Sequence, residues 1–209
     1  MNKTYSKLAA LAAVVAVGGV GIFGFLLPRL AGDDRFAACR QTTVAAGGDP
    51  FGGPFTLTSE TGARVSDTDV ITKPTLLYFG YTYCPDVCPI DSARTAEAVE
   101  LLREQGRDVG HVFISFDPKR DTPETLAEFT SYFDDDMLGL TGTEEEIAAL
   151  ARAYRVFYKT NGDDPEDYLM DHSTVTYLQF PEHGVVDFIN RATPANEIAK
   201  TVACFMDAA

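Results

Sequence analysis

Two cysteines four positions apart are the residues in this sequence best suited to chemistry. Cys84 and Cys88 lie in Cys-Pro-Asp-Val-Cys-Pro (84–89), after an apolar run of strand length and at the expected start of a helix. An open α/β sheet binds ligands at the carboxyl ends of its strands, which is where the pair falls. We expect both sulfurs on one helical face, where backbone amides and the helix dipole favour thiolates.

Such a pair can form a redox-active disulfide or bind a soft metal. A purely structural disulfide is the alternative, although so short a loop would stabilise the fold by only about 2 kcal/mol.

A histidine is the candidate third ligand. His172 lies at the end of a long polar loop, just before an expected strand, where its ring can reach a neighbouring loop. His111 opens an expected buried strand and His183 lies in a hairpin turn, so we interpret both as structural or solvated. Two thiolates and one imidazole form a trigonal set suited to copper(I), and zinc with an added water ligand is the alternative.

The composition is typical of an ordinary globular domain. The chain has 209 residues, 45% of them hydrophobic and 23% charged, which is enough to build one core. Its formal net charge of -14 repels phosphate backbones, so we expect no nucleic-acid partner. The negative charge is explained either by a partner with a basic patch or by an ordinary solvated surface.

The pattern of apolar residues predicts the elements that position the cysteines. A β-hairpin is expected at 55–67, buried strands at 75–81 and 111–117, and a second hairpin from strands 174–180 and 185–190. Helices are expected from Cys88 to Gln105, from Thr122-Pro123 to Phe133, from Thr143 onward, and from Pro194 to Met206. Two strand–helix–strand units followed by a hairpin and a terminal helix predict a mixed sheet with helices on both faces.

The N-terminal segment has the length of a membrane span. Residues 8–27 carry no charge, and a helix of that length crosses about 30 Å of hydrocarbon. Lys3 and Lys7 precede it, which favours an N-terminus inside the cell. A cleaved signal peptide is one alternative, and a lipoprotein modified at Cys39 is another. We divide the chain into an anchor with a short cytoplasmic tail (1–35), a linker (36–54) and a soluble domain (55–209).

Three segments resemble the motifs of the Sco/SenC family of copper chaperones. They are Tyr-Phe-Gly-Tyr-Thr-Tyr-Cys-Pro-Asp-Val-Cys-Pro (78–89), Ser-Phe-Asp-Pro-Lys-Arg-Asp-Thr-Pro (115–123) and Asp-His-Ser (171–173), and the resemblance spans roughly 50–207. It implies a thioredoxin-like fold tethered to a membrane by one helix. It also implies a role in cytochrome c oxidase assembly, at the copper A centre of subunit II.

The resemblance implies roles for individual residues. Cys84, Cys88 and His172 would bind copper as copper(I), with copper(II) left open, and Asp86 and Asp117 would orient the site or contact partners. The two aspartates are equally well interpreted as turn and cap residues. A thiol-disulfide reductase acting on the subunit II cysteines is the second hypothesis, and a peroxiredoxin or redox sensor is the third. Besides subunit II, another copper chaperone or a thioredoxin-like reductant is a possible partner.

Two cysteines lie outside these motifs. Cys39 comes just before the domain and Cys204 lies in the last expected helix. In an oxidising compartment we expect them to form a disulfide, with two free buried thiols as the alternative. We expect the protein in a bacterial inner membrane, with its C-terminal domain in the periplasm.

Overall fold

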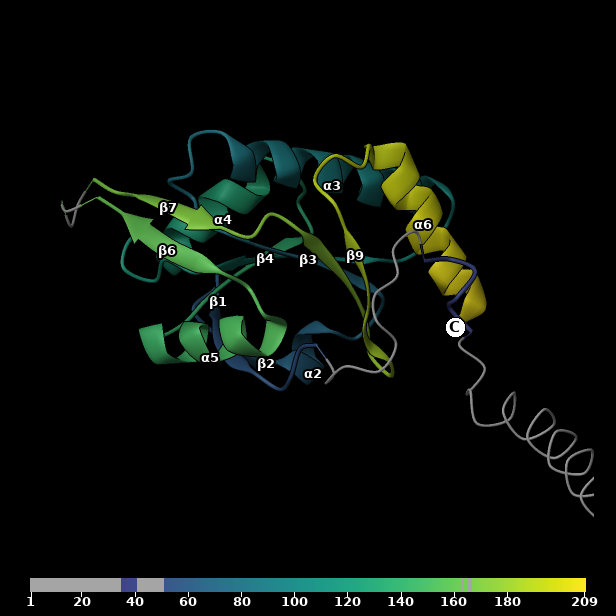
Figure 1. Cartoon of the computed structure of the whole chain (residues 1–209), viewed down its shortest axis with the longest axis horizontal. Coiled ribbons are helices and arrows are strands. Elements are labelled where there is room, and N and C mark those ends of the chain that lie inside the picture. The colour runs from purple at the N-terminus through teal and green to yellow at the C-terminus, as the bar shows by residue number, and fades with distance from the viewer. Residues whose placement is uncertain (1–34, 41–50, 163, 165–166) are drawn as a thin grey trace, which may run out of the picture. The chain divides into compact units, whose positions relative to one another are not determined.

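The computed structural model describes residues 35–40, 51–162, 164 and 167–209. Residues 39–209 form one compact unit, built on a seven-stranded sheet in the order β2-β1-β5-β4-β3-β8-β9 (Figure 1). Its strands are β1 (Thr56–Ser59), β2 (Arg64–Ser66), β3 (Thr75–Gly80), β4 (Gly110–Ser115), β5 (Met137–Thr141), β8 (Thr176–Phe180) and β9 (Gly184–Ile189).

The sheet is mixed, as the sequence predicts. Strands β3, β4 and β5 are parallel neighbours, and Gly80 at the end of β3 lies in register with Ser115 at the end of β4. Strand β1 runs antiparallel to β5, and β8 runs antiparallel to β3. Because parallel strands end at the same edge, the loops after β3 and β4 lie side by side. The Phe116 amide donates to the Gly80 carbonyl at 3.0 Å, which joins these loops directly.

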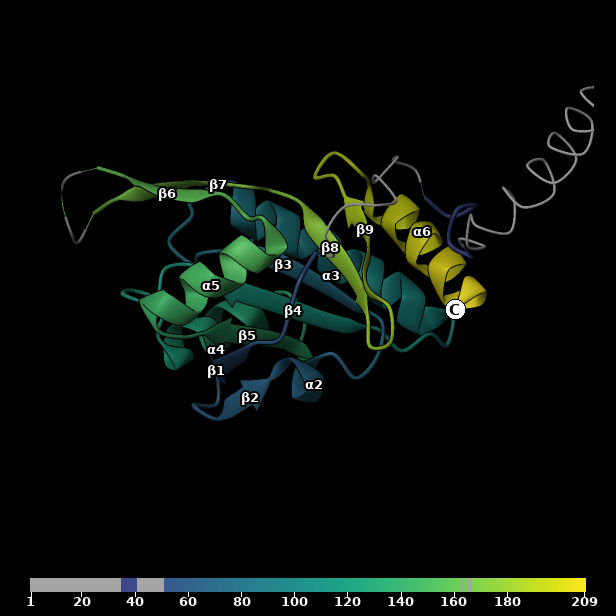
Figure 2. The same cartoon turned by 60° about the horizontal axis from the view of Figure 1, so that its bottom comes forward.

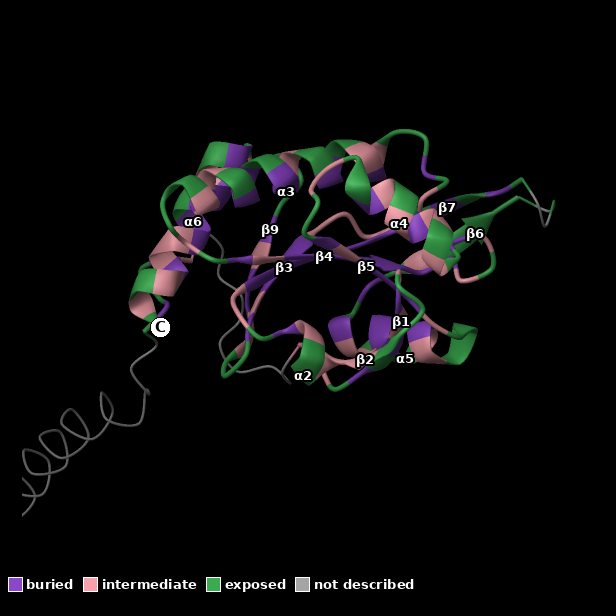
Figure 3. Cartoon of the chain, turned by 180° about the vertical axis from the view of Figure 1, so that it is seen from behind, coloured by how far each residue is buried: buried purple, intermediate pink, exposed green. Residues whose placement is uncertain are grey.

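Helices cover both faces of this sheet. Helices α3, α4 and α6 lie on one face, and α5 lies on the other together with the short α2 (Figures 1 and 3). Their bounds are α2 (Asp67–Val70), α3 (Val87–Glu104), α4 (Pro123–Ser131), α5 (Glu144–Tyr154) and α6 (Ala195–Ala208). Helices α4 and α5 begin where the sequence predicts, and the hydroxyls of Thr122 and Thr143 cap them by accepting amide hydrogen bonds.

Strand β3 forms the centre of the core because it is covered from both sides. All six of its residues are buried, as the continuous apolar run predicts. The Phe79 ring packs against the rings of Tyr154 in α5 and Tyr177 in β8, at centroid distances of 5.3 and 5.5 Å. A well-packed strand therefore leads straight into the cysteine loop.

The segment before His172 differs from the expected polar loop. It forms a two-stranded antiparallel ribbon of β6 (Tyr158–Asn161) and β7 (Leu169–His172). The ribbon extends beyond the edge of the main sheet, and the chain continues from β7 into β8 (Figure 2). His172 therefore lies at the end of a strand and pairs with Tyr158.

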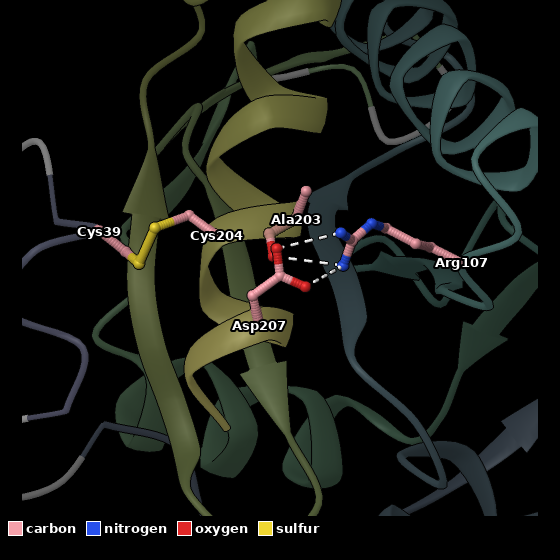
Figure 4. The surroundings of a disulfide bond; sticks show 5 residues. All are labelled: Cys39, Arg107, Ala203, Cys204 and Asp207. Atoms are coloured by element: carbon pink, nitrogen blue, oxygen red, sulfur yellow. Dashed lines mark hydrogen bonds and ion pairs between the residues drawn. A yellow bond between two sulfur atoms is a disulfide. The ribbon is translucent and has the colours of Figure 1, made fainter.

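A disulfide joins Cys39 to Cys204 in α6, with Cα atoms 5.6 Å apart (Figure 4). The bond expected from the sequence is thus present, and the Cys39 sulfur in it is not available for lipidation. Next to the bond, Arg107 donates to both carboxylate oxygens of Asp207, at 2.8 and 3.0 Å. These contacts hold the last helix to the body of the domain.

The expected membrane span at 8–27 lies outside the described residues. Within the described ranges, no helix is both long enough and apolar enough to cross a bilayer.

Candidate metal centre

Three potential metal ligands meet at the carboxyl edge of the parallel strands. The Sγ atoms of Cys84 and Cys88 and a ring nitrogen of His172 all lie within 4.8 Å of one another. Both cysteines are buried and reduced, and His172 is half-buried. The cysteines follow β3, whereas the histidine comes from β7, 84 residues after Cys88. The structure therefore brings together the three ligands proposed from the sequence.

The two cysteines do not share a helical face, contrary to the expectation. Helix α3 begins at Val87, so Cys88 lies in its first turn and Cys84 lies in the preceding loop. Cys84 precedes Pro85, and a residue before proline is disfavoured in helical conformation. The Cys88 amide donates to the Cys84 sulfur at 3.3 Å. The helix N-terminus thus still stabilises the Cys84 thiolate, although through a loop cysteine.

His172 is oriented by a contact on the far side of its ring. Its Nδ1 lies 2.8 Å from the Ser173 carbonyl oxygen, an acceptor, so Nδ1 carries the proton and donates it. Its Nε2 then offers a lone pair toward Cys88, whose sulfur is 3.4 Å away. A histidine held in this way is set up to bind a metal through Nε2.

Aromatic side chains surround the imidazole. The His172 ring centroid lies 4.9 Å from that of Phe116, 6.0 Å from Tyr81 and 6.4 Å from Tyr78. The Met170 amide donates to the Tyr81 hydroxyl at 3.1 Å, which ties β7 to the cysteine loop. This apolar shell limits water around the ligands and suits a soft, monovalent cation.

Gly80 leaves the room that the Cys88 sulfur occupies. A β-carbon at residue 80 would lie 2.9 Å from the Cys88 Sγ and 2.8 Å from a ring carbon of Phe113. Both distances are shorter than van der Waals contact. A glycine is therefore needed where β3 passes beneath the metal ligands.

The two thiols have opposite pKa shifts. A hydrogen bond from the Cys88 side chain, helped by His172 and by nearby amides, holds the pKa of Cys84 well below its usual value despite burial. The same pairing, together with burial, raises the pKa of Cys88. At neutral pH the apo site therefore holds one thiolate, at Cys84, and one thiol, at Cys88. Burial also raises the pKa of the Tyr78 phenol, which stays protonated and donates to Asp91 at 3.0 Å.

A buried carboxyl group connects the loops after β3 and β4. Asp121 accepts the Thr82 amide and hydroxyl at 3.0 and 2.6 Å, and it also accepts the Ser115 hydroxyl. Burial raises the pKa of Asp121. This connection fixes the loop that leads into Cys84.

The two aspartates singled out from the sequence lie outside the ligand group. Asp86 is exposed at the N-cap position of α3, and its side chain makes no capping hydrogen bond. Asp117 is buried and accepts the Tyr168 hydroxyl at 2.5 Å and the Arg120 Nε at 2.6 Å. Asp117 therefore acts on the site through the segment that leads into β7.

Sequence reasoning missed several residues that support the site: Tyr78, Gly80, Tyr81, Thr82, Phe116, Asp121 and Ser173. All seven fall inside the three motif segments, and that is the signal that could have found them. Their types alone do not reveal these roles, because most of them depend on a partner from another loop or strand, such as Tyr81 with Met170 and Thr82 with Asp121.

The SCO1/SenC family matches this chain over residues 43–207. Protein SenC of Rhodobacter capsulatus is 54% identical over 203 residues, which cover 97% of this chain and 90% of that protein. Among solved structures, Arabidopsis thaliana ScoI with copper bound is 40% identical with a TM-score of 0.71, covering 75% of this chain and 99% of that one. BsSco, described as a member of the Sco family of cytochrome c oxidase assembly proteins with a disulfide switch, is 28% identical with a TM-score of 0.59, covering 74% and 94%.

The mixed sheet with a cysteine pair after its central strand defines a protein of the thioredoxin-like class, as expected. The chain belongs to the SCO1/SenC family.

Proposed function

We propose that this protein is a copper chaperone for the assembly of cytochrome c oxidase. In this role Cys84, Cys88 and His172 hold copper and pass it to the copper A site of subunit II. The observation that carries the proposal is the convergence of two sulfurs and one imidazole nitrogen within 4.8 Å. Copper bound to a relative of the same fold supports it.

The donor set suits copper(I) as a cargo. Soft thiolates prefer copper(I), and three ligands leave the ion open to a fourth group from a partner. Transfer then proceeds by stepwise exchange, in which each incoming ligand replaces one of the three. Copper binding also requires loss of the Cys88 proton, since the metal binds thiolates.

A thiol-disulfide reductase is the second candidate, and the lowered pKa of Cys84 favours it. The Cys84 thiolate would attack a partner disulfide, forming a mixed disulfide and releasing one partner thiolate. Cys88 would then attack the Cys84 sulfur, closing a Cys84–Cys88 disulfide and releasing the second partner thiol. Two electrons pass to the partner, and a thioredoxin-like reductant would restore the dithiol.

We place the domain on the outer face of a bacterial inner membrane. Residues 8–27 would span the bilayer, with Lys3 and Lys7 inside and the domain in the periplasm. A disulfide such as Cys39–Cys204 suits an oxidising compartment. The test is alkylation of a cysteine introduced at Glu182 by a membrane-impermeant maleimide. Labelling in intact spheroplasts supports this placement, and labelling only after lysis contradicts it.

Delivery to subunit II separates the two candidates. The copper(I)-loaded, full-length protein is mixed anaerobically with the reduced, metal-free copper A domain, and copper is quantified on each protein after separation. A chaperone transfers copper, whereas its form with a Cys84–Cys88 disulfide transfers none. In a second arm the reduced, copper-free protein is mixed with the oxidised domain, and two new thiols per domain would indicate reductase activity. Failure of both arms would contradict the proposal.

A further inference from the structure

Large apolar side chains are exposed around the segments that carry the metal ligands. In the described residues the exposed ones are Tyr83, Ile90, Tyr132, Phe157 and Leu169. Tyr83 directly precedes Cys84, and Ile90 lies two residues after Cys88. Single exposed apolar residues are ordinary. Of these five, Tyr83 and Tyr132 lie together, because both line one hollow.

A small groove lies at this surface. It has a volume of about 200 Å³ and is lined by Thr82, Tyr83, Thr125, Glu128, Phe129 and Tyr132; we call it the docking groove. The groove adjoins the cysteine loop, which supplies Thr82 and Tyr83. Its opposite wall comes from α4 and the residue that follows it.

The two tyrosines of the docking groove differ in how firmly they are held. The Arg120 guanidinium lies 4.7 Å from the Tyr83 ring centroid, and its charge is already paired with Asp117 at 2.6 Å. The Tyr132 hydroxyl donates to Glu128 at 3.4 Å. The Arg120 contact orients the Tyr83 ring, whereas the long hydrogen bond of the exposed Tyr132 leaves that ring free to adjust to a partner.

The charges around the docking groove are mostly negative. Glu128 is exposed, and among the described residues it makes no ion pair. Tyr132 also borders a second hollow, which is lined by five acidic residues and Arg103. Arg103 is ion-paired with Glu100, Asp134 and Asp136. Within the described residues, the other two acids of this hollow, Glu97 and Asp135, make no ion pair. The whole chain carries -14. A basic partner is the one that these charges attract.

We propose that the docking groove and the acidic hollow beside it bind a basic segment of the protein with which this chain exchanges copper. A lysine or arginine of that segment lays its alkyl stem between Tyr83 and Tyr132 and places its charge at Glu128. Basic side chains bury their apolar stems in this way while the charged head stays at the surface. The contact would hold the partner's ligands close to Cys84. This inference rests on the copper exchange proposed above.

Copper transfer rates test the inference. Copper(I)-loaded full-length variants are mixed with the metal-free copper A domain in a stopped-flow instrument. Glu128→Lys should slow the second-order transfer at least about tenfold at low salt, while added salt should slow the wild type more than the variant. Tyr132→Ser should slow transfer at both salt concentrations. Copper affinity should stay within about twofold of the wild type in both variants, since neither residue touches the ligands.

The matched control is Glu182→Lys, which makes the same charge change in the exposed turn between β8 and β9. It should transfer copper at a rate within about twofold of the wild type. If Glu128→Lys and Glu182→Lys slow transfer equally, the slowing comes from the change in net charge, and the proposal that the partner binds at the docking groove is wrong. Transfer at the wild-type rate in both Glu128→Lys and Tyr132→Ser would also refute this proposal.

A second measurement is independent of the copper acceptor. The probe is the peptide acetyl-Ala-Lys-Ala-Arg-amide, titrated into the isotope-labelled full-length protein and followed by amide NMR shifts. Shifts at Thr82, Thr125 and Glu128 that disappear in Glu128→Lys support the groove, even if subunit II accepts no copper. Shifts confined to Phe157 and Leu169, or no shifts at all, contradict it. Failure of the proposed function and failure of this inference are thus distinguishable.

Discussion

Replacing Gly80 by alanine should both destabilise the fold and weaken copper binding. The new β-carbon would lie 2.9 Å from the Cys88 sulfur and 2.8 Å from the Phe113 ring. Carbon contacts are optimal from about 3.5 Å, so the sulfur must withdraw by about 0.6 Å. Overpacking of a buried site costs about 1–3 kcal/mol of unfolding free energy. Metal–ligand distances tolerate about 0.2 Å, so copper(I) affinity should fall about 10- to 100-fold.

The matched control is Gly110→Ala, at the other end of the same strand pair. Its β-carbon would lie 2.6 Å from the Thr75 Oγ1, and Gly110 is in register with Thr75. This variant should be destabilised by a similar amount but should keep wild-type copper affinity when folded. Urea denaturation of the metal-free protein measures stability, and anaerobic competition with a chromophoric chelator measures affinity. If Gly80→Ala loses stability yet binds copper as tightly as the wild type, the glycine does not position the Cys88 sulfur.

Two further predictions follow from the thiols and from the disulfide. Because the pKa of Cys84 is lowered and that of Cys88 raised, copper(I) should displace one proton at neutral pH. The logarithm of the affinity should then rise by about one per pH unit between about pH 6 and 8; calorimetry in two buffers counts the protons, and a count of two would contradict the assignment. Replacing Cys39 and Cys204 together by serine should lower the unfolding free energy by about 3–5 kcal/mol, because the bond spans 165 residues. Chemical denaturation measures this loss, and an unchanged midpoint would mean that the closed loop contributes nothing.

Much of the sheet and its helices can be predicted from local patterns. The apolar run that becomes β3 (75–80) is buried throughout, and the threonine before Pro123 caps α4. These features can be predicted because each depends on neighbouring residues in the sequence. The cysteine pair can be predicted for the same reason, since its spacing and its place after a strand are local features.

The ribbon that carries His172 could not be predicted in this way. Strand β6 (Tyr158–Asn161) is exposed along most of its length, so it lacks the alternation of apolar and polar residues that identifies a strand. Its partner β7 has a single buried residue, Met170. The position of His172 depends on this pairing and on the Tyr81–Met170 hydrogen bond, which are long-range contacts.

The prediction that Cys84 lies in the helix is wrong, and the sequence itself holds the reason. Pro85 restricts the residue before it, and so excludes Cys84 from the helix. Pro89, by contrast, lies in the first turn of α3, where its missing amide hydrogen costs nothing. The burial of Asp121 had no such signal, because its partners Thr82 and Ser115 come from other loops and strands.

The central claim is that two sulfurs and one imidazole form a single copper site. The direct measurement is an anaerobic copper(I) titration of the reduced full-length protein against a chromophoric chelator, with Cys84→Ser, His172→Ala and the control His183→Ala, whose histidine is exposed in the β8–β9 turn. We predict one tightly bound copper(I) per chain, unchanged in His183→Ala and weakened at least about a hundredfold in the other two variants. Equal copper(I) affinities in the wild type and all three variants would contradict the claim that these residues form the copper site.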